Sequence, residues 1–369
     1  MTRASAVLAL AAASRVAALT WNPTAWLSRR THEPRSTYIA AQTIWIPTDV
    51  YQGDTFFDQF DFFNYSDPTN GLVNYVNRDV AMRNDNPLAY VDNDQAVIRV
   101  DNWSWLGSGQ HRDSVRLESK TTYDGGLFIM DVEHAPTGCA VWPAYWTLGR
   151  AEQWPGAGEI DIIEGVHNNQ HDQVTWHTSA GCTLTDPGNF SGTAIHNNCE
   201  ANVVGGCGIV DWSSSSFGAT FNSYGGGVYA MRWDNSSIDI WFFYRATVPQ
   251  DIVQGNPKPT YQNWGRPSAS LSNLNCDLKK YFRKHAIIIN ITLCGDWAGN
   301  TYQADGCSGS CNDRVMDPGN MDNATWVINS LRVYQPRTLE GLMSGALDLG
   351  SSRDAALVTA ATSLALFAW

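Results

Sequence analysis

Short runs of alternating apolar and polar residues recur along most of the chain, and the alternation has the period of a β-strand. Successive side chains of a strand point to opposite faces, so every second residue shares a face. Such runs occupy residues 96–100, 128–133, 238–245 and 287–293, and no helical period is evident in them. Glycine and proline turns separate the runs. The pattern predicts an all-β sandwich built of many short strands.

The run at residues 287–293 is strongly apolar on one face. Ile287, Ile289, Ile291 and Leu293 share that face, while Asn290 lies between them and begins an N-x-S/T sequon. We therefore expect Asn290 to point outward, where a glycan can be attached.

The stretch at residues 158–165, GEIDIIEG, carries three carboxylates within six residues. Its isoleucines favour a strand, in which Glu159 and Asp161 share a face and Glu164 points away. A β-bulge after Asp161 would return Glu164 to the acidic face, and bulges often lie beside active sites. Like charges on one face cost stability. A functional role for these carboxylates is therefore the favoured interpretation.

Glycosidic bond hydrolysis is the chemistry that uses such a pair of carboxylates. One carboxylate attacks the anomeric carbon and the other, protonated at rest, gives its proton to the leaving oxygen. Neighbouring negative charges raise the pKa of one partner and keep it protonated. A retaining mechanism would need the two carboxyl groups about 5 Å apart. The alternatives are a solvated polar strand face and a calcium site built of clustered acids.

The chain closely resembles glycoside hydrolase family 16 in its laminarinase-like form, whose catalytic strand reads E-x-D-x-x-E. The resemblance covers residues 36–336, and the fungal endo-β-1,3(4)-glucanases are the most similar group. It implies that Glu159 is the nucleophile, Glu164 the general acid/base, and Asp161 a residue that tunes their charges. It also implies a jelly roll of two curved antiparallel sheets with a substrate cleft on the concave face, and an opening strand at residues 56–63. The segments that carry the resemblance besides residues 158–165 are CAVWPAYWTLG (139–149), VTWHT (174–178), GGGVYAMRW (225–233), IDIWFF (238–243) and ITLCGDWAG (291–299).

A glucan cleft needs aromatic walls, because the hydrogens of a glucose ring pack on an indole face while its hydroxyls find polar partners. The resemblance implies sugar contacts for Trp142 and Trp297; Trp154 lies near the catalytic motif, and Trp103, beside the sequon at Asn102, is a weaker candidate. Plain core packing is the alternative for each tryptophan. His177 is expected to face the cleft and to bond sugar or Glu164. Arg112 resembles an arginine near the non-reducing side of the cleft, with a surface salt bridge as the alternative.

Composition is compatible with one large secreted domain. The formal net charge of −12 argues against nucleic acid or an anionic membrane surface as partner, since both attract basic surfaces, whereas a neutral polysaccharide is compatible with it. The spacing of the eight cysteines fits no zinc site, so we expect them to form disulfides. Disulfides indicate a protein that is secreted through an oxidising compartment. Cys182–Cys199 and pairs among Cys294, Cys307 and Cys311 look sterically easy. The six sequons begin at Asn64, Asn102, Asn189, Asn235, Asn290 and Asn323.

The ends of the chain differ from the catalytic domain expected at residues 36–337. Residues 1–35 form a leader whose apolar run at 4–13 is typical of a signal peptide, although Arg15 interrupts the pattern. Residues 338–369 end in a 15-residue apolar tail, too short for an ordinary membrane span. Small residues at 344–346, a spacer and this tail indicate a GPI-attachment signal.

The sequence therefore predicts a secreted or cell-surface retaining endo-glucanase that cuts β-1,3 and mixed β-1,3/1,4 glucans. We expect a monomer with no cofactor, no catalytic metal and no nucleic-acid partner; a structural calcium ion would follow from family analogy alone. Two other functions stay open. A wall-remodelling transglycosylase would pass the same covalent intermediate to a sugar hydroxyl, and a jelly-roll binding module would hold glucan without cutting it.

Overall fold

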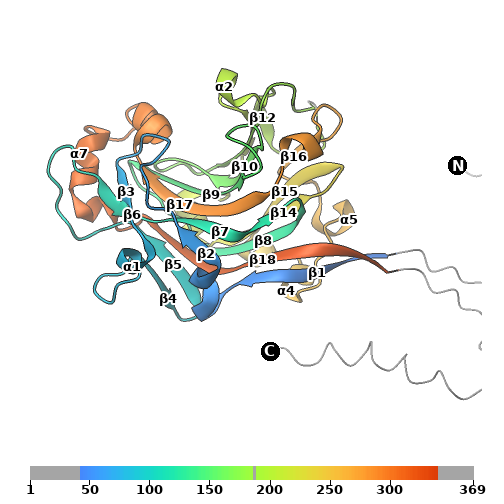
Figure 1. Ribbon diagram of the computed structural model, residues 1–369, viewed down its shortest axis with the longest axis horizontal. Helices are drawn as coiled ribbons and strands as arrows, with labels where there is room; N and C mark the ends of the chain where they lie inside the picture. Colours follow the sequence, from blue (N-terminus) through green and yellow to red (C-terminus); the bar gives the residue numbers. More distant parts are fainter. Residues whose placement is uncertain (1–41, 186–187, 340–369) are drawn as a thin grey trace, which may run out of the picture. The chain divides into compact units, whose positions relative to one another are not determined.

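The computed structural model describes residues 42–185 and 188–339, and the expected leader and GPI signal lie outside them. Two antiparallel sheets form the frame of this part of the chain, and Figure 1 shows them stacked as two layers. We call them the outer sheet and the cleft sheet. The predicted jelly-roll sandwich is confirmed.

The outer sheet has the order β16-β15-β14-β8-β18-β5-β4, with β1 also paired to β18. Its strands are β1 (Gln42–Tyr51), β4 (Ala89–Asp92), β5 (Gln95–Arg99), β8 (Gly126–His134), β14 (Gly227–Trp233), β15 (Ser237–Tyr244), β16 (Ala269–Ser272) and β18 (Thr325–Leu339). The cleft sheet has the order β12-β13-β11-β10-β9-β17-β7-β2. Its strands are β2 (Phe60–Phe62), β7 (Arg116–Tyr123), β9 (Val141–Gly149), β10 (Glu159–Glu164), β11 (Asp172–His177), β12 (Thr193–His196), β13 (Cys207–Asp211) and β17 (His285–Leu293).

Short helices and a small parallel pair of strands occupy the connections. In Figure 1 the segments around α2 and β12 rise on one side of the cleft sheet, and those around α7 rise on the other. The parallel pair is β3 (Val73–Tyr75) with β6 (Arg112–Ser114). The helices are α1 (Arg78–Ala81), α2 (Ala201–Val204), α3 (Gly218–Ser223), α4 (Gln250–Val253), α5 (Tyr261–Trp264), α6 (Leu278–Tyr281), α7 (Cys311–Met316), η1 (Gly53–Gln59), η2 (Arg245–Thr247), η3 (Gly295–Gly299) and η4 (Pro318–Met321).

The main core lies between the facing sides of the two sheets. It follows the predicted alternation: Ile98, Met130, Ile240 and Ile289 are all buried in it. Trp176 of β11 and Trp326 of β18 are its largest fully buried side chains. Packing of this kind contributes roughly 1.5–3 kcal/mol for each large apolar side chain. The inner faces are thereby committed to the core, which leaves the opposite face of the cleft sheet free for a site.

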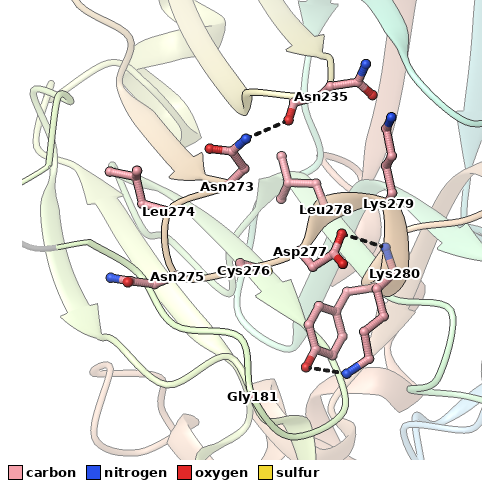
Figure 2. Close-up of a pocket in the computed structure, with 11 residues that line it drawn as sticks. Gly181, Asn235, Asn273, Leu274, Asn275, Cys276, Asp277, Leu278, Lys279 and Lys280 are labelled. Carbon is pink, nitrogen blue, oxygen red and sulfur yellow. Dashed lines mark hydrogen bonds between the residues drawn. The ribbon is translucent and has the colours of Figure 1, made fainter.

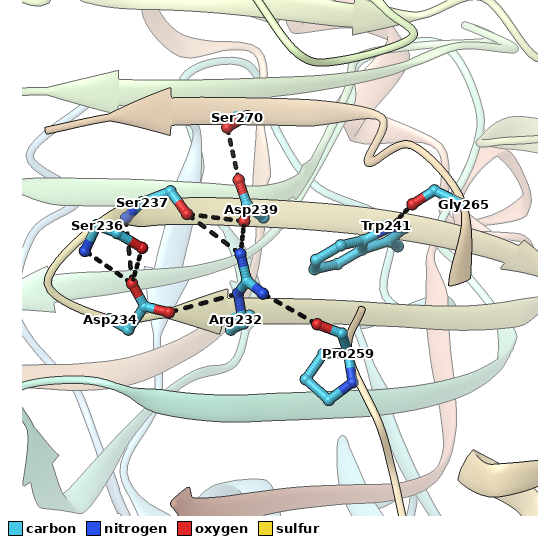
Figure 3. Close-up of polar contacts among 9 residues, drawn as sticks. All are labelled: Arg232, Asp234, Ser236, Ser237, Asp239, Trp241, Pro259, Gly265 and Ser270. Atoms are coloured by element: carbon cyan, nitrogen blue, oxygen red, sulfur yellow. Dashed lines mark hydrogen bonds and ion pairs between the residues drawn. The ribbon is translucent and has the colours of Figure 1, made fainter. Parts of the chain in front are cut away.

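A second apolar cluster covers the far face of the outer sheet. Trp241 of β15 packs on Trp264 of α5 with ring centroids 5.4 Å apart. Beside them, Arg232 forms ion pairs with Asp234 and Asp239 and donates a hydrogen bond to the carbonyl oxygen of Pro259, as Figure 3 shows. These contacts fasten the segment that carries α4 and α5 onto the sheet. The arrangement explains why both faces of β15 are apolar.

The segment expected to open the domain as a strand is different in the structure. The first half of residues 56–63 belongs to the 3₁₀-helix η1, and only Phe60–Phe62 form a strand. Phe56, Phe57 and Phe60 are all buried. This spacing suits a helical turn rather than a strand that alternates its faces. An earlier strand, β1, was not expected, and it pairs along most of its length with the end of β18.

Four disulfides join the eight cysteines. The pair Cys182–Cys199, which the sequence only marks as sterically easy, does not form, because Cys182 bonds Cys276 and Cys199 bonds Cys207. The bond Cys294–Cys311 is among the pairs expected. Cys139 bonds Cys307 across 168 residues, a pairing that chain proximity cannot reveal. Bonds of this kind fit an extracellular protein. Across residues 42–185 and 188–339, no helix combines the length and the apolar character needed to cross a membrane.

Candidate active site

A β-bulge in β10 turns three carboxylates to one face of the strand. In the pairing with β9, Glu159, Asp161 and Glu164 lie opposite Leu148, Trp146 and Ala144, and the register shifts between Asp161 and Ile163. All six residues line the same cleft. Ile160, Ile162 and Ile163 are buried on the other side. The extra residue therefore returns Glu164 to the face of Glu159 and Asp161, and the predicted bulge is confirmed.

Glu159 and Glu164 each accept a hydrogen bond from a tryptophan. Trp154 Nε1 donates to Glu159 Oε2 over 2.8 Å, and Trp142 Nε1 donates to Glu164 Oε1 over 2.8 Å. Burial, and then the charge of Asp161, raises the pKa of Glu159 to about 7. The same two causes raise the pKa of Glu164 well above its ordinary value. The raised pKa favours the protonated form of Glu164, and Glu159 lies near its titration point at neutral pH.

His177 lies against the acidic residues at the end of β11. Its Nε2 atom is 3.0 Å from Asp161 Oδ2 and 3.7 Å from Glu159 Oε1. Burial lowers the pKa of His177, but the charges of Glu159, Asp161 and Glu164 outweigh burial and raise it to about 9. The ring is therefore an imidazolium at neutral pH. The structure pairs it with Asp161 and Glu159, whereas the expectation named Glu164.

Four tryptophans line the cleft, which has a volume of about 640 Å³. Trp142 and Trp297 meet edge to face with ring centroids 5.8 Å apart. Trp154 is 48% exposed beside Glu159 and so presents its indole to a ligand. Trp146 donates a hydrogen bond from Nε1 to Asn290 Oδ1 over 2.7 Å. Aromatic faces beside polar groups suit the two sides of a pyranose ring.

Several residues of the cleft were not predicted. Thr175 and Gln173 share the cleft face of β11 with His177, and the alternation of that strand could have identified them. Asn290 was expected to point outward into solvent, which is wrong. It is 7% exposed on the floor of the cleft, where Nδ2 donates to the hydroxyl of Tyr75 over 3.2 Å. The other unpredicted residues that line the cleft include Asp67, Pro68, Thr69, Arg116, Thr292 and Asp296.

Arg112 and Trp103 do not line the cleft, contrary to prediction. Arg112 is fully buried, and its guanidinium donates to the carbonyl oxygens of Asp101, Val315 and Met316. It fastens the segment before η4 to β6. Trp103 packs against the main core, with Arg99 on its ring at 5.5 Å. Neither side chain is placed to contact a ligand of the cleft.

Within the described residues, one group of side chains has ligand atoms close enough to hold a metal ion. Glu159, Asp161 and His177 offer atoms that all lie within 4.8 Å of one another. Calcium takes six to eight oxygen ligands, so a set of two carboxylates and an imidazolium nitrogen fits it poorly. The group is better suited to tuning charge than to holding a structural calcium ion.

A second hollow lies on the surface and shares no lining residue with the cleft. Figure 2 shows it at the turn between β16 and α6, where Asn273 Nδ2 donates a hydrogen bond to the carbonyl oxygen of Asn235 over 2.9 Å. Leu274, at 76% exposure, stands at its rim. Its lining has one carboxylate, Asp277, and one aromatic ring, Tyr281, and so lacks the carboxylate pair and the tryptophans of the cleft. The catalytic chemistry is therefore sought in the cleft alone.

Comparisons with known proteins agree with this geometry. Residues 60–334 match the family model described as "XgeA-like, catalytic GH16 domain". The chain belongs to glycoside hydrolase family 16. The family 16 domain is 42% identical over 292 residues to a probable glycosidase of Schizosaccharomyces pombe, covering 77% of this chain and 68% of that one. It is 38% identical to an endo-1,3(4)-beta-glucanase of Arthroderma benhamiae, covering 80% of this chain and 65% of that one.

Solved structures of the family share the fold. GH16 laminarinase 16A of Phanerochaete chrysosporium, described with 6-O-glucosyl-laminaritriose in both donor and acceptor sites, matches with a TM-score of 0.75 and 41% identity. The match covers 80% of this chain and 100% of that one. Some curated relatives are much longer: this chain spans only 49% of the endo-1,3(4)-beta-glucanase of Emericella nidulans. The predicted family and fold are thus confirmed for the catalytic domain.

Proposed function

We propose that the protein is an extracellular retaining endo-glucanase that hydrolyses β-1,3 linkages in laminarin-type and mixed β-1,3/1,4 glucans. The observation that carries this proposal is the placement of Glu159 and Glu164 on one face of a bulged strand, within a cleft lined by tryptophans. The names of its relatives support the substrate class, since both an endo-1,3(4)-beta-glucanase and a laminarinase are about 40% identical to this chain.

In the first step, Glu159 attacks the anomeric carbon while Glu164 gives its proton to the glycosidic oxygen. The bond between that oxygen and the anomeric carbon breaks, and a glycosyl ester forms on Glu159. The raised pKa of Glu164 favours the protonated carboxyl that gives this proton. The hydrogen bond from Trp154 and the charge of His177 lower the pKa of Glu159, which favours the ionised nucleophile.

In the second step, Glu164 takes a proton from water, and the water oxygen attacks the anomeric carbon. The ester breaks and Glu159 leaves as a carboxylate. The charge of Glu159 is one of the causes that raise the pKa of Glu164. Esterification removes this charge, so the pKa of Glu164 falls when it must act as a base. One residue can therefore serve both steps.

Asp161 and the tryptophans have supporting roles in this proposal. Asp161 orients the imidazolium of His177 and raises the pKa of both glutamates, Glu164 included. Trp142 and Trp297 pack edge to face in the cleft, and Trp154 donates a hydrogen bond to Glu159. We therefore assign sugar contacts to all three tryptophans. Stacking on such faces would hold the chain while its hydroxyls bond the polar residues of the cleft.

Transglycosylation is the second candidate, because one structural relative is described as an elongating GH family 16 beta-1,3-glucosyltransferase. That protein is 37% identical, with a TM-score of 0.73 and coverage of 79% of this chain and 100% of its own. A sugar hydroxyl would then replace water in the second step. The bulged motif favours hydrolysis, but the balance depends on the acceptor side of the cleft.

Incubation of the purified protein with laminarin tests these alternatives, with Glu159→Ser as the matched variant. We expect short oligosaccharides from the wild type and a loss of at least about a thousandfold in the variant, as for a missing nucleophile. Products longer than the donor would identify a transglycosylase. Binding of laminarin and of mixed-linkage glucan without cleavage of either would refute the enzyme and favour the binding module.

Attachment to the cell surface through a GPI anchor is a separate proposal. It is supported by the small residues at 344–346, the spacer and the terminal apolar tail. Release of the protein from cells by phosphatidylinositol-specific phospholipase C would support it, and retention after that treatment would refute it. We also propose that the enzyme works as a monomer without a cofactor, which size-exclusion chromatography and assays with chelator test directly.

A further inference from the structure

Glu164 pairs with Ala144 of β9, but on its other side the backbone N–H of Glu164 is held by a side chain of β11 rather than by the β11 ladder. The pairing of β10 with β11 runs from Glu159↔His177 to Asp161↔Thr175 and stops where the bulge begins. Beyond that point the N–H group of Glu164 donates to Oδ1 of Asp172 over 2.9 Å. A carboxyl oxygen thus replaces a ladder carbonyl at the residue that must transfer the proton.

Asp172 is itself firmly placed. It is the first residue of β11, lies opposite Asp211 of β13, and is 1% exposed. Its own N–H donates to the hydroxyl of Ser216 over 2.9 Å, and Ser216 is fully buried. Burial raises the pKa of Asp172 well above its ordinary value. A buried group with fixed partners on both sides can define the position of the backbone that it bonds.

Asp172 does not line the cleft, and the hydrogen bond that joins it to the catalytic residues is the one from the Glu164 N–H. The side chain of Glu164 is fixed by Trp142 Nε1, and its backbone by Asp172. Catalysis is sensitive to such placement, since an error of about 1 Å can cost about a hundredfold in rate. A residue of this kind affects proton transfer while it leaves the nucleophile in place.

We propose that Asp172 is a positioning residue for the general acid/base: its side-chain acceptor fixes the backbone N–H of Glu164 at the bulge and thereby sets the reach of the Glu164 carboxyl to the glycosidic oxygen. This inference rests on the proposed function. It differs from a purely structural role, because it predicts that loss of the acceptor impairs only reactions that need proton transfer.

The test compares two substrates that differ in their need for an acid. Laminarin has a sugar leaving group that must be protonated, whereas a 2,4-dinitrophenyl β-laminarioside releases a phenolate that needs no proton. The kcat/KM for dinitrophenolate release reports the attack by Glu159. Glu164→Ala provides the reference for complete loss of the acid. Asp172→Ala removes the acceptor, and Asp172→Asn keeps an oxygen at the same place.

For Asp172→Ala we expect a loss of about tenfold to a hundredfold on laminarin and less than about threefold on the aryl substrate. Asp172→Asn should stay within about threefold of the wild type on both. Ser216→Ala removes the hydroxyl that accepts from the Asp172 N–H, so it should give a smaller loss of the same kind, on laminarin rather than on the aryl substrate. If Asp172→Ala does not fold, Asp172→Ser, whose hydroxyl is too short to reach Glu164, carries the same comparison.

Equal losses on both substrates, or no loss on laminarin, would overturn the role of Asp172 while leaving the proposed function intact. Failure of Asp172→Asn to restore laminarin hydrolysis would overturn it as well. A wild type inactive on both substrates would instead refute the proposed function, and this inference with it. The two failures are therefore distinguishable.

Discussion

Nε2 of His177 lies 3.0 Å from Oδ2 of Asp161. It also lies 3.7 Å from Oε1 of Glu159, so a single cation faces two of the three carboxylates of β10. This pairing offsets the repulsion that the sequence alone would assign to three like charges on one strand face. It also couples the titration of His177 to that of Glu159 and Glu164.

Replacement of His177 by Asn should move the whole pH profile to higher pH. The imidazolium lowers the pKa of both Glu159 and Glu164. Without the imidazolium, Glu159 stays protonated to a pH above about 7, and Glu164 also loses its proton at a higher pH. Both limbs of the pH profile of kcat/KM therefore move to higher pH. We expect a loss of about tenfold at neutral pH, equivalent to about one pKa unit. Thr175→Val, which changes the same face of β11 without removing a charge, should leave both limbs in place; a profile that does not move in the His177 variant would contradict the assignment.

Replacement of Trp142 by Phe should move only the basic limb. The indole hydrogen bond lowers the pKa of Glu164, and phenylalanine keeps an aromatic ring but has no donor. The pKa of Glu164 then rises, so the basic limb moves to higher pH. The acidic limb, which is set by Glu159, does not change. Measured pH profiles of kcat/KM on laminarin check this. Movement of the acidic limb instead would show that the roles of Glu159 and Glu164 are exchanged.

The sequence predicted the strands and the catalytic motif because both depend on local periodicity. Alternation of apolar residues identified the core faces, and three carboxylates on one strand required a bulge to meet. Whether a residue outside the two large sheets points into the cleft is decided by the tertiary fold. Arg112 was assigned to the cleft, yet its guanidinium is satisfied by backbone carbonyls inside the protein.

Asn290 shows a second limit of sequence reasoning. The alternation of β17 correctly places it away from the main core, but the face opposite a core need not be in contact with solvent. Here that face is the floor of the cleft, where Asn290 bonds Trp146 and Tyr75. The turn at residues 67–69 reaches the same cleft from a distant part of the chain. Such meetings depend on topology, which local patterns do not encode.

Removal of the disulfide Cys294–Cys311 should lower both stability and substrate affinity. Cys294 directly precedes η3, which carries Trp297 into the cleft, and the bond closes a loop of 17 residues. A loop of this length corresponds to about 3 kcal/mol in the free energy of unfolding. The double variant Cys294→Ser/Cys311→Ser should therefore unfold at lower denaturant concentration and show a raised KM for laminarin.

The matched control for this bond is Cys182→Ser/Cys276→Ser. Cys276 lines the second hollow, which Figure 2 shows, and it lies outside the cleft. Loss of that bond should reduce the free energy of unfolding without raising KM. Equal KM effects in both double variants would show that the Cys294–Cys311 bond has no specific influence on Trp297.

Glycan occupancy should differ sharply between two of the sequons. Asn235 is exposed at the second hollow, where its backbone carbonyl accepts a hydrogen bond from Asn273 and its side chain points outward. Asn290 is buried in the cleft, and both its side-chain oxygen and its nitrogen are bonded. A glycan on Asn290 would break these bonds and fill the cleft beside Trp146. Mass spectrometry of active, secreted enzyme after enzymatic deglycosylation in heavy-oxygen water should therefore mark Asn235 and leave Asn290 unmarked.

Asn235→Gln should keep full activity, whereas Asn290→Ala should lose about 1–3 kcal/mol of stability, because it leaves buried partners unbonded. Detection of a glycan on Asn290 in enzyme that still cuts laminarin would contradict the position of this residue in the cleft.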